Sequence, residues 1–202
     1  MAYYIRVLSP LETPVSLEVL RQAAGADVVV DADVSADSQE GNWRQLVIGY
    51  ADGTEVCIVE RDGLDGDLVA DEVDEFLQEI ESCEPQSAAG WLASYLPRVQ
   101  TIYAIQILNA VYERPNGWEI VRAVQGAIWN AAGGIIQADG EGFSNEDGYH
   151  ILWQFSDNVT GSWWMAVLDG DAWVNFEMDL GDPDQRAAFR RGELPPKVAK
   201  ID

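Results

Sequence analysis

The chain has 202 residues, of which 35 are Asp or Glu and 12 are Lys or Arg, so its formal charge at pH 7 is -23. A surface with this charge repels anions and attracts cations, which excludes the nucleic-acid backbone as an expected ligand. Apolar residues make up 48% of the chain and aromatic residues 10%. A disordered acidic chain has far fewer of either, so we expect the charge on the surface of a folded protein.

The sequence indicates a cytoplasmic protein. It has no apolar run of about 18 residues that could span a membrane, and its first residues lack the basic and apolar regions of a signal peptide. Cys57 and Cys83 have no metal-binding spacing, and both are expected to be free thiols. No membrane association and no cofactor are expected.

The first half of the chain predicts an α+β arrangement. A strand over 3–8 precedes a helix that should begin at Thr13 and Pro14, where a hydroxyl cap precedes a proline, and end at Gly25. Strands are expected over 26–34, 44–50 and 55–61, the last two joined as a hairpin, and a helix with one apolar face over 69–82.

A short apolar helix, starting at Ser87 and stopping before Pro97, is expected to connect the two halves. The second half then predicts a strand over 104–109, a helix over 118–132 capped by Asn116, and strands over 151–157 and 172–178. The last helix should be capped by Asp182, open at Pro183 and end at Gly192.

The two halves resemble each other. Residues 104–109 echo residues 4–9, Ala23-Ala24-Gly25 matches Ala131-Ala132-Gly133, and the order of elements is the same, which is consistent with either an internal duplication or a chance similarity. We therefore predict mainly antiparallel sheet packed against helices in two similar halves, 1–83 and 102–202, joined by 84–101 in one compact unit. In topology alone this order is similar to the effector-binding fold of bacterial gyrase-inhibitor-like proteins, but no motif residues are shared, so no function follows from it.

No catalytic pattern stands out. His150 is the only histidine, it stands at the start of a predicted strand, and the chain contains no Gly-x-Ser-x-Gly motif. The acidic loop over 139–148 does not have the spacing of a calcium-binding EF-hand loop. The protein is therefore more readily interpreted as a binding protein than as an enzyme.

Two kinds of side chain are candidates for binding. If the halves are duplicated, two pairs of carboxylates in corresponding strands could converge, and alternation along each strand would put the members of a pair on one face. Trp163 and Trp164 are adjacent in a strand, so they point to opposite faces, and one of them is a candidate exposed aromatic beside carboxylates. The candidate binding residues are Asp31, Asp33, Asp139, Glu141, Glu146, Asp147, Trp163 and Trp164.

Three functions fit these features. The first is a non-enzymatic protein whose acidic face binds a basic protein partner, in the manner of an immunity protein or a nucleic-acid mimic. The second is a module that binds a small cationic or apolar ligand in an aromatic cleft between the halves, and the third is a carboxylate-based or metal-dependent hydrolase. A homodimer is a further option, because Arg186, Arg190 and Arg191 could meet the acidic face of a second copy.

Overall fold

A computed structural model describes residues 3–12, 14–32, 43–63 and 66–201. The chain forms two compact units, and each unit is built from two separate segments. The first unit comprises Met1–Ala70 and Val99–Gly134, and the second comprises Asp71–Arg98 and Ile135–Asp202. Helix α2 (Gly66–Ile80) contributes residues to both.

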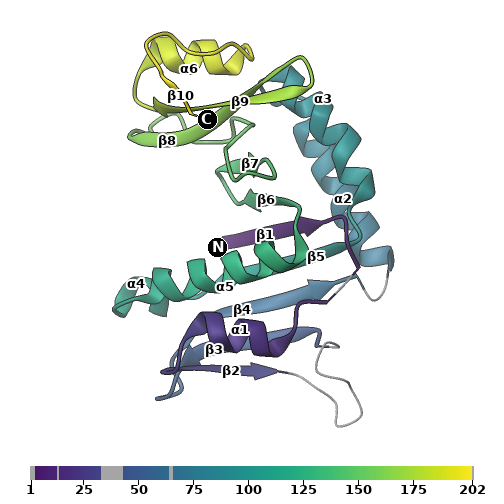
Figure 1. Cartoon of the computed structure of the whole chain (residues 1–202), viewed down its shortest axis with the longest axis vertical. Coiled ribbons are helices and arrows are strands. Elements are labelled where there is room, and N and C mark those ends of the chain that lie inside the picture. The colour runs from purple at the N-terminus through teal and green to yellow at the C-terminus, as the bar shows by residue number, and fades with distance from the viewer. Residues whose placement is uncertain (1–2, 13, 33–42, 64–65, 202) are drawn as a thin grey trace. The chain divides into compact units, whose positions relative to one another are not determined.

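The first unit contains an antiparallel sheet in the order β2-β3-β4-β5-β1 (Figure 1). The strands are β1 (Tyr3–Ser9), β2 (Val28–Ala32), β3 (Gln45–Tyr50), β4 (Glu55–Asp62) and β5 (Thr101–Ile107). Strand β5 is buried along almost its whole length, which agrees with its central place between β4 and β1. These units differ from the expected ranges 1–83, 84–101 and 102–202, because β5, expected to open the second half, completes the sheet of the first unit.

Two helices of the first unit, α1 (Leu17–Ala24) and α5 (Gly117–Ala132), pack side by side on one face of this sheet (Figure 1). A short helix, α4 (Ala110–Glu113), leads into α5. Trp43 is fully buried in the core, where its ring lies 5.9 Å from that of Tyr103 and its indole N–H donates to the Val15 carbonyl at 2.8 Å. The buried indole thus has the polar partner that it needs.

The two segments that echo each other in sequence pair with each other in this sheet. Strands β1 and β5 are antiparallel, and Ile5 lies directly opposite Ile105, the residue that the sequence comparison equates with it. A local two-fold relation of this kind is what a duplicated strand would produce. The internal duplication itself stays a prediction.

The second unit contains α3 (Gln86–Tyr95), a short 3-10 helix over Leu96–Arg98, a hairpin of β6 (Ile135–Ala138) and β7 (Gly142–Ser144), and a second antiparallel sheet. That sheet has the order β10-β9-β8, formed by β8 (Ser162–Asp169), β9 (Ala172–Asp179) and β10 (Lys200–Ile201). One face of β8 and β9 packs on α6 (Pro183–Arg190) through Met165, Phe176, Met178 and Phe189.

The structure is an α+β protein with mostly antiparallel sheet packed against helices, as predicted. Most of the predicted elements are present within a few residues of the expected bounds. Three details of local structure differ from the predictions.

The first helix begins after Ser16, which caps it by accepting from Val19 N, and not at Thr13, which lies outside the described residues. The segment 151–157 is not a strand, because its backbone donors have different partners: Ile151 N donates to Phe143 O and Trp153 N to Glu84 O. Asn116 precedes α5 as expected, but its side chain makes no capping hydrogen bond.

Candidate functional site

An exposed aromatic residue stands on the second unit. Trp164, in β8, is 63% exposed, whereas its neighbour Trp163 is partly buried against the core face of the same sheet. The structure therefore places the two tryptophans on opposite faces of the strand, as alternation requires, and leaves Trp164 on the outside.

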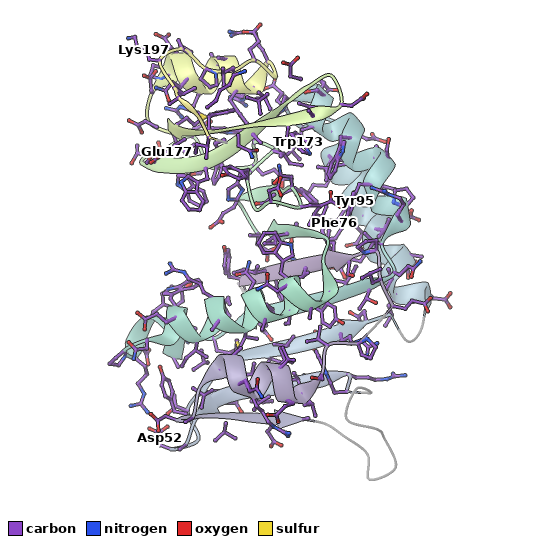
Figure 2. All side chains as sticks on the ribbon, viewed as in Figure 1. Asp52, Phe76, Tyr95, Trp173, Glu177 and Lys197 are labelled. Atoms are coloured by element: carbon purple, nitrogen blue, oxygen red, sulfur yellow. The ribbon has the colours of Figure 1, made fainter. Side chains whose placement is uncertain are left out.

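The register of the sheet puts a carboxylate directly beside Trp164. The two-residue turn Gly170-Asp171 places Asp169 opposite Ala172. Along the same register, Trp164 lies opposite Glu177 and Ser162 lies opposite Asp179. Directly opposed side chains in an antiparallel pair have their Cβ atoms about 5 Å apart. Glu177, labelled on β9 in Figure 2, is exposed and accepts a hydrogen bond from Ser162 Oγ, so its carboxylate is held next to the Trp164 ring.

A second aromatic ring lies on the other side of Trp164. The segment around His150 runs parallel to β8: His150 N donates to Trp164 O, and Ala166 N donates to His150 O. This pairing places Tyr149 on the same face as Trp164, with ring centroids 6.2 Å apart. We call the surface formed by Tyr149, Ser162, Trp164 and Glu177 the Trp164 face.

Glu146 and Asp147 lie in the exposed turn just before Tyr149. The fully buried Asn145 holds this turn, because its Oδ1 accepts from Asp147 N at 3.1 Å and from Tyr149 N at 3.0 Å. The same side chain thus fixes both the acidic turn and the backbone of the aromatic residue that follows it.

His150 points to the opposite side of the sheet, toward the core. Its ring centroid lies 4.8 Å from that of Trp163 and 5.4 Å from that of Phe155, and Ser144 Oγ is 3.4 Å from its Nδ1. Burial lowers the pKa of His150 to about 4, because the aromatic surroundings disfavour the charged imidazolium. At neutral pH the imidazole is uncharged, so it adds no positive charge that would oppose a cation.

A hollow of about 290 Å³ lies beside Trp164, lined by Gly148, His150, Ser162, Trp163 and Trp164. Helix α3 packs on the same face of the sheet as Trp164, but near the turn between β8 and β9. There Trp91 contacts Trp173, with ring centroids 5.2 Å apart. The Trp164 face therefore combines the rings of Tyr149 and Trp164 with the carboxylate of Glu177, and it could hold the cationic end of a Lys or Arg side chain.

The other candidate residues are Asp31, Asp33, Asp139 and Glu141. Asp31 is exposed on β2 in the first unit, and Asp33 lies outside the described residues. Asp139 and Glu141 belong to the second unit, in the turn between β6 and β7, so the strand alternation expected to align them does not apply and that prediction is wrong. Convergence of the carboxylate pairs stays a prediction.

The described residues contain no group of three or more His, Cys, Asp or Glu side chains that could hold a metal ion. Cys57 and Cys83 are both free, and burial raises the pKa of the Cys57 thiol to about 12. None of the helices in the described part of the chain has the length and apolar character that a membrane span requires.

The arginines considered for a homodimer have partners within the second unit. Arg190 pairs with Glu84 at 2.7 Å, Arg191 pairs with Glu193 at 2.7 Å, and Arg186 donates to the Asp157 carbonyl at 2.9 Å. A homodimer stays a prediction.

Comparisons of this chain with protein-family models, with curated proteins and with solved structures give no match.

Sequence reasoning missed three residues of the Trp164 face. Glu177 could have been found, because the Asp169-Gly170-Asp171 turn signal fixes the hairpin register and with it the residue opposite Trp164. Ser162 follows from the same register. Tyr149 could not have been found, because its position depends on a parallel pairing with no turn signal in the sequence.

Proposed function

We propose that this chain is a non-enzymatic binding protein that engages a basic protein partner through the Trp164 face. The observation that carries the proposal is an indole 63% exposed to solvent, flanked by the Tyr149 ring and by the Glu177 carboxylate. Exposed aromatic residues with adjacent charges are typical anchors of protein interfaces.

The chemistry of the face favours a Lys or Arg side chain of the partner. An aromatic ring attracts a cation to its face, with a contribution of up to about 2 kcal/mol when the contact is desolvated. Glu177 would pair with that cation, and the net charge of -23 would raise the rate of encounter with a basic partner. A cytoplasmic location belongs to the same proposal, and the two free thiols support it because reducing compartments keep cysteines unpaired.

The test uses synthetic peptides with alternating Gly-Arg or Gly-Lys sequences, titrated against the whole chain by isothermal calorimetry. Replacing Trp164 by Ala should weaken binding roughly tenfold or more, because the ring contact is lost. Glu177→Gln should weaken it by a smaller factor, about threefold to tenfold, because one charge pair is removed.

The matched control is Glu55→Gln, which removes one negative charge from an exposed position of β4 in the first unit. It should leave the affinity within about twofold of the unchanged protein, because long-range charge is screened at physiological salt. Equal binding by the Trp164→Ala variant and the unchanged protein would overturn the proposal, since binding would then reflect overall charge alone.

A further inference from the structure

A second hollow lies on the first unit, independent of the Trp164 face. It has a volume of about 380 Å³ and sits where the turn between α1 and β2, the end of β3 and the first turns of α5 meet. We call it the Tyr50 hollow and define it by Ala24, Asp27, Tyr50, Glu119, Ile120 and Ala123.

The walls of the Tyr50 hollow are largely apolar and held in place. Ala24 and Ile120 are both buried, and Ala123 adds a methyl group from the next turn of α5. Tyr50 supplies an aromatic wall, and its hydroxyl donates to the Pro115 carbonyl at 2.7 Å, which fixes the ring against the turn before α5.

A close approach between α4 and α5 fixes the start of α5, which forms one side of the Tyr50 hollow. A Cβ on Gly117 would lie 2.6 Å from the main chain of Val111, so only glycine allows the turn to bring the start of α5 this close to α4. Glu119 then follows two residues later, on the rim of the hollow.

The charge in the Tyr50 hollow is negative and locally uncompensated. The Asp27 and Glu119 side chains line it, and neither carboxylate forms a hydrogen bond or an ion pair with another side chain or backbone group in the described part of the chain. The described residues that line the hollow include no Lys or Arg. The Arg114 guanidinium lies 5.2 Å from the centroid of the Tyr50 ring, but it is engaged by Asp52 and Thr54.

We propose that the Tyr50 hollow binds a small protonated amine with a short apolar or aromatic body. The apolar walls would contact the body of such a ligand, and the two carboxylates would pair with its ammonium group. The volume is at the lower end of the range of about 300–1,000 Å³ for small-molecule pockets, so the ligand is a small one. An anion would be repelled by both carboxylates.

The test uses phenethylamine and its neutral counterpart 2-phenylethanol, which have the same ring and chain length and differ in the terminal group. Each is titrated into the whole chain and followed by calorimetry and by amide shifts in a nitrogen-15 NMR spectrum. Phenethylamine should bind, with shifts at Ala24, Asp27 and the first turn of α5, and should bind at least about tenfold more tightly than the alcohol because only the amine is charged.

Variants distinguish binding in the Tyr50 hollow from attraction of the amine by the overall negative charge. Asp27→Asn and Glu119→Gln should each weaken amine binding about threefold to tenfold, and Ala123→Leu should abolish it by filling the hollow. Glu55→Gln, which removes the same charge elsewhere on the first unit, should leave binding unchanged, and melting curves should show that every variant folds.

Equal affinity for the amine and the alcohol, no binding up to about 10 mM, or unchanged binding in Glu119→Gln would each overturn the inference. The Trp164→Ala variant should bind phenethylamine as the unchanged protein does. Because the two sites lie in different units, this site can fail while the proposed function of the Trp164 face stands, and the reverse is equally possible.

Discussion

His150 shows how strongly a single environment sets the properties of a side chain. The only histidine of the chain packs against Trp163 and Phe155, and Ser144 Oγ lies 3.4 Å from its Nδ1. Burial lowers its pKa to about 4 from the ordinary value of 6.5. The residue that composition would first suggest for acid-base chemistry is therefore a neutral, half-buried side chain at pH 7.

The depressed pKa of His150 predicts an acid-sensitive fold. Between pH 6.5 and 4 the unfolded chain binds a proton at His150 that the folded chain does not, so stability falls as the pH falls through this window. The loss at pH 4 relative to pH 7 should reach about 3 kcal/mol. Urea denaturation at several pH values measures it.

The control is His150→Phe, which keeps an aromatic ring at the position and cannot titrate. The difference in stability between the unchanged protein and this variant should shift in favour of the variant as the pH falls from 6.5 to 4. Parallel pH profiles for the two proteins would show that His150 is not responsible, since carboxylates that protonate in the same range affect both equally.

At the scale of elements, α6 begins with both a side-chain cap and a first-turn proline. Asp182 caps it by accepting from Asp184 N at 2.9 Å and Gln185 N at 3.2 Å, and Pro183 follows in the first turn. This helix carries Phe189, which is fully buried against the core face of β8 and β9. The cap therefore supports the sheet on whose other face Trp164 stands.

Replacing Asp182 by Ala should lower the free energy of unfolding by about 1 kcal/mol, because two backbone donors at the start of α6 lose their partner. Asp182→Asn should retain most of the stability, since the amide oxygen can still accept. Chemical denaturation of the three proteins gives the comparison. A loss as large in the Asn variant as in the Ala variant would mean that charge, and not the cap geometry, is what Asp182 contributes.

At the scale of the whole molecule, the dominant property is the charge of -23. Such a charge repels itself in the compact state and relaxes when the chain unfolds. The Debye length falls from about 30 Å at 0.01 M salt to about 8 Å at 0.15 M, so added salt should relieve much of this repulsion.

We therefore expect the melting temperature to rise between about 10 mM and 200 mM NaCl. Replacing the exposed Glu75 and Asp171 by Lys reduces the negative charge by four and should make the rise smaller. Scanning calorimetry at several salt concentrations checks both statements. A melting temperature that is flat or falls over this range would contradict the expected dominance of self-repulsion.

The sequence predicted local structure well where a local signal existed. The hairpin of β3 and β4 followed from its turn, α6 from Asp182 and Pro183, and the outward position of one of two adjacent tryptophans from strand alternation. The prediction of a strand over 151–157, which rested on alternating apolar residues, was wrong. The apolar residues of this segment are buried, but backbone groups of the segment bond to separate neighbours, and no periodicity in the sequence records such partners.

The sequence by itself determined the fold class, the acidic surface and most helix and strand positions, because these depend on composition and on periodicities of a few residues. Only the tertiary structure decided that Tyr149 lies beside Trp164, that His150 packs against Trp163 and Phe155, and that Asp27 and Glu119 share one hollow. Each of these depends on segments far apart in the chain being brought together. Long-range pairing is set by how whole elements pack, which a single sequence does not display.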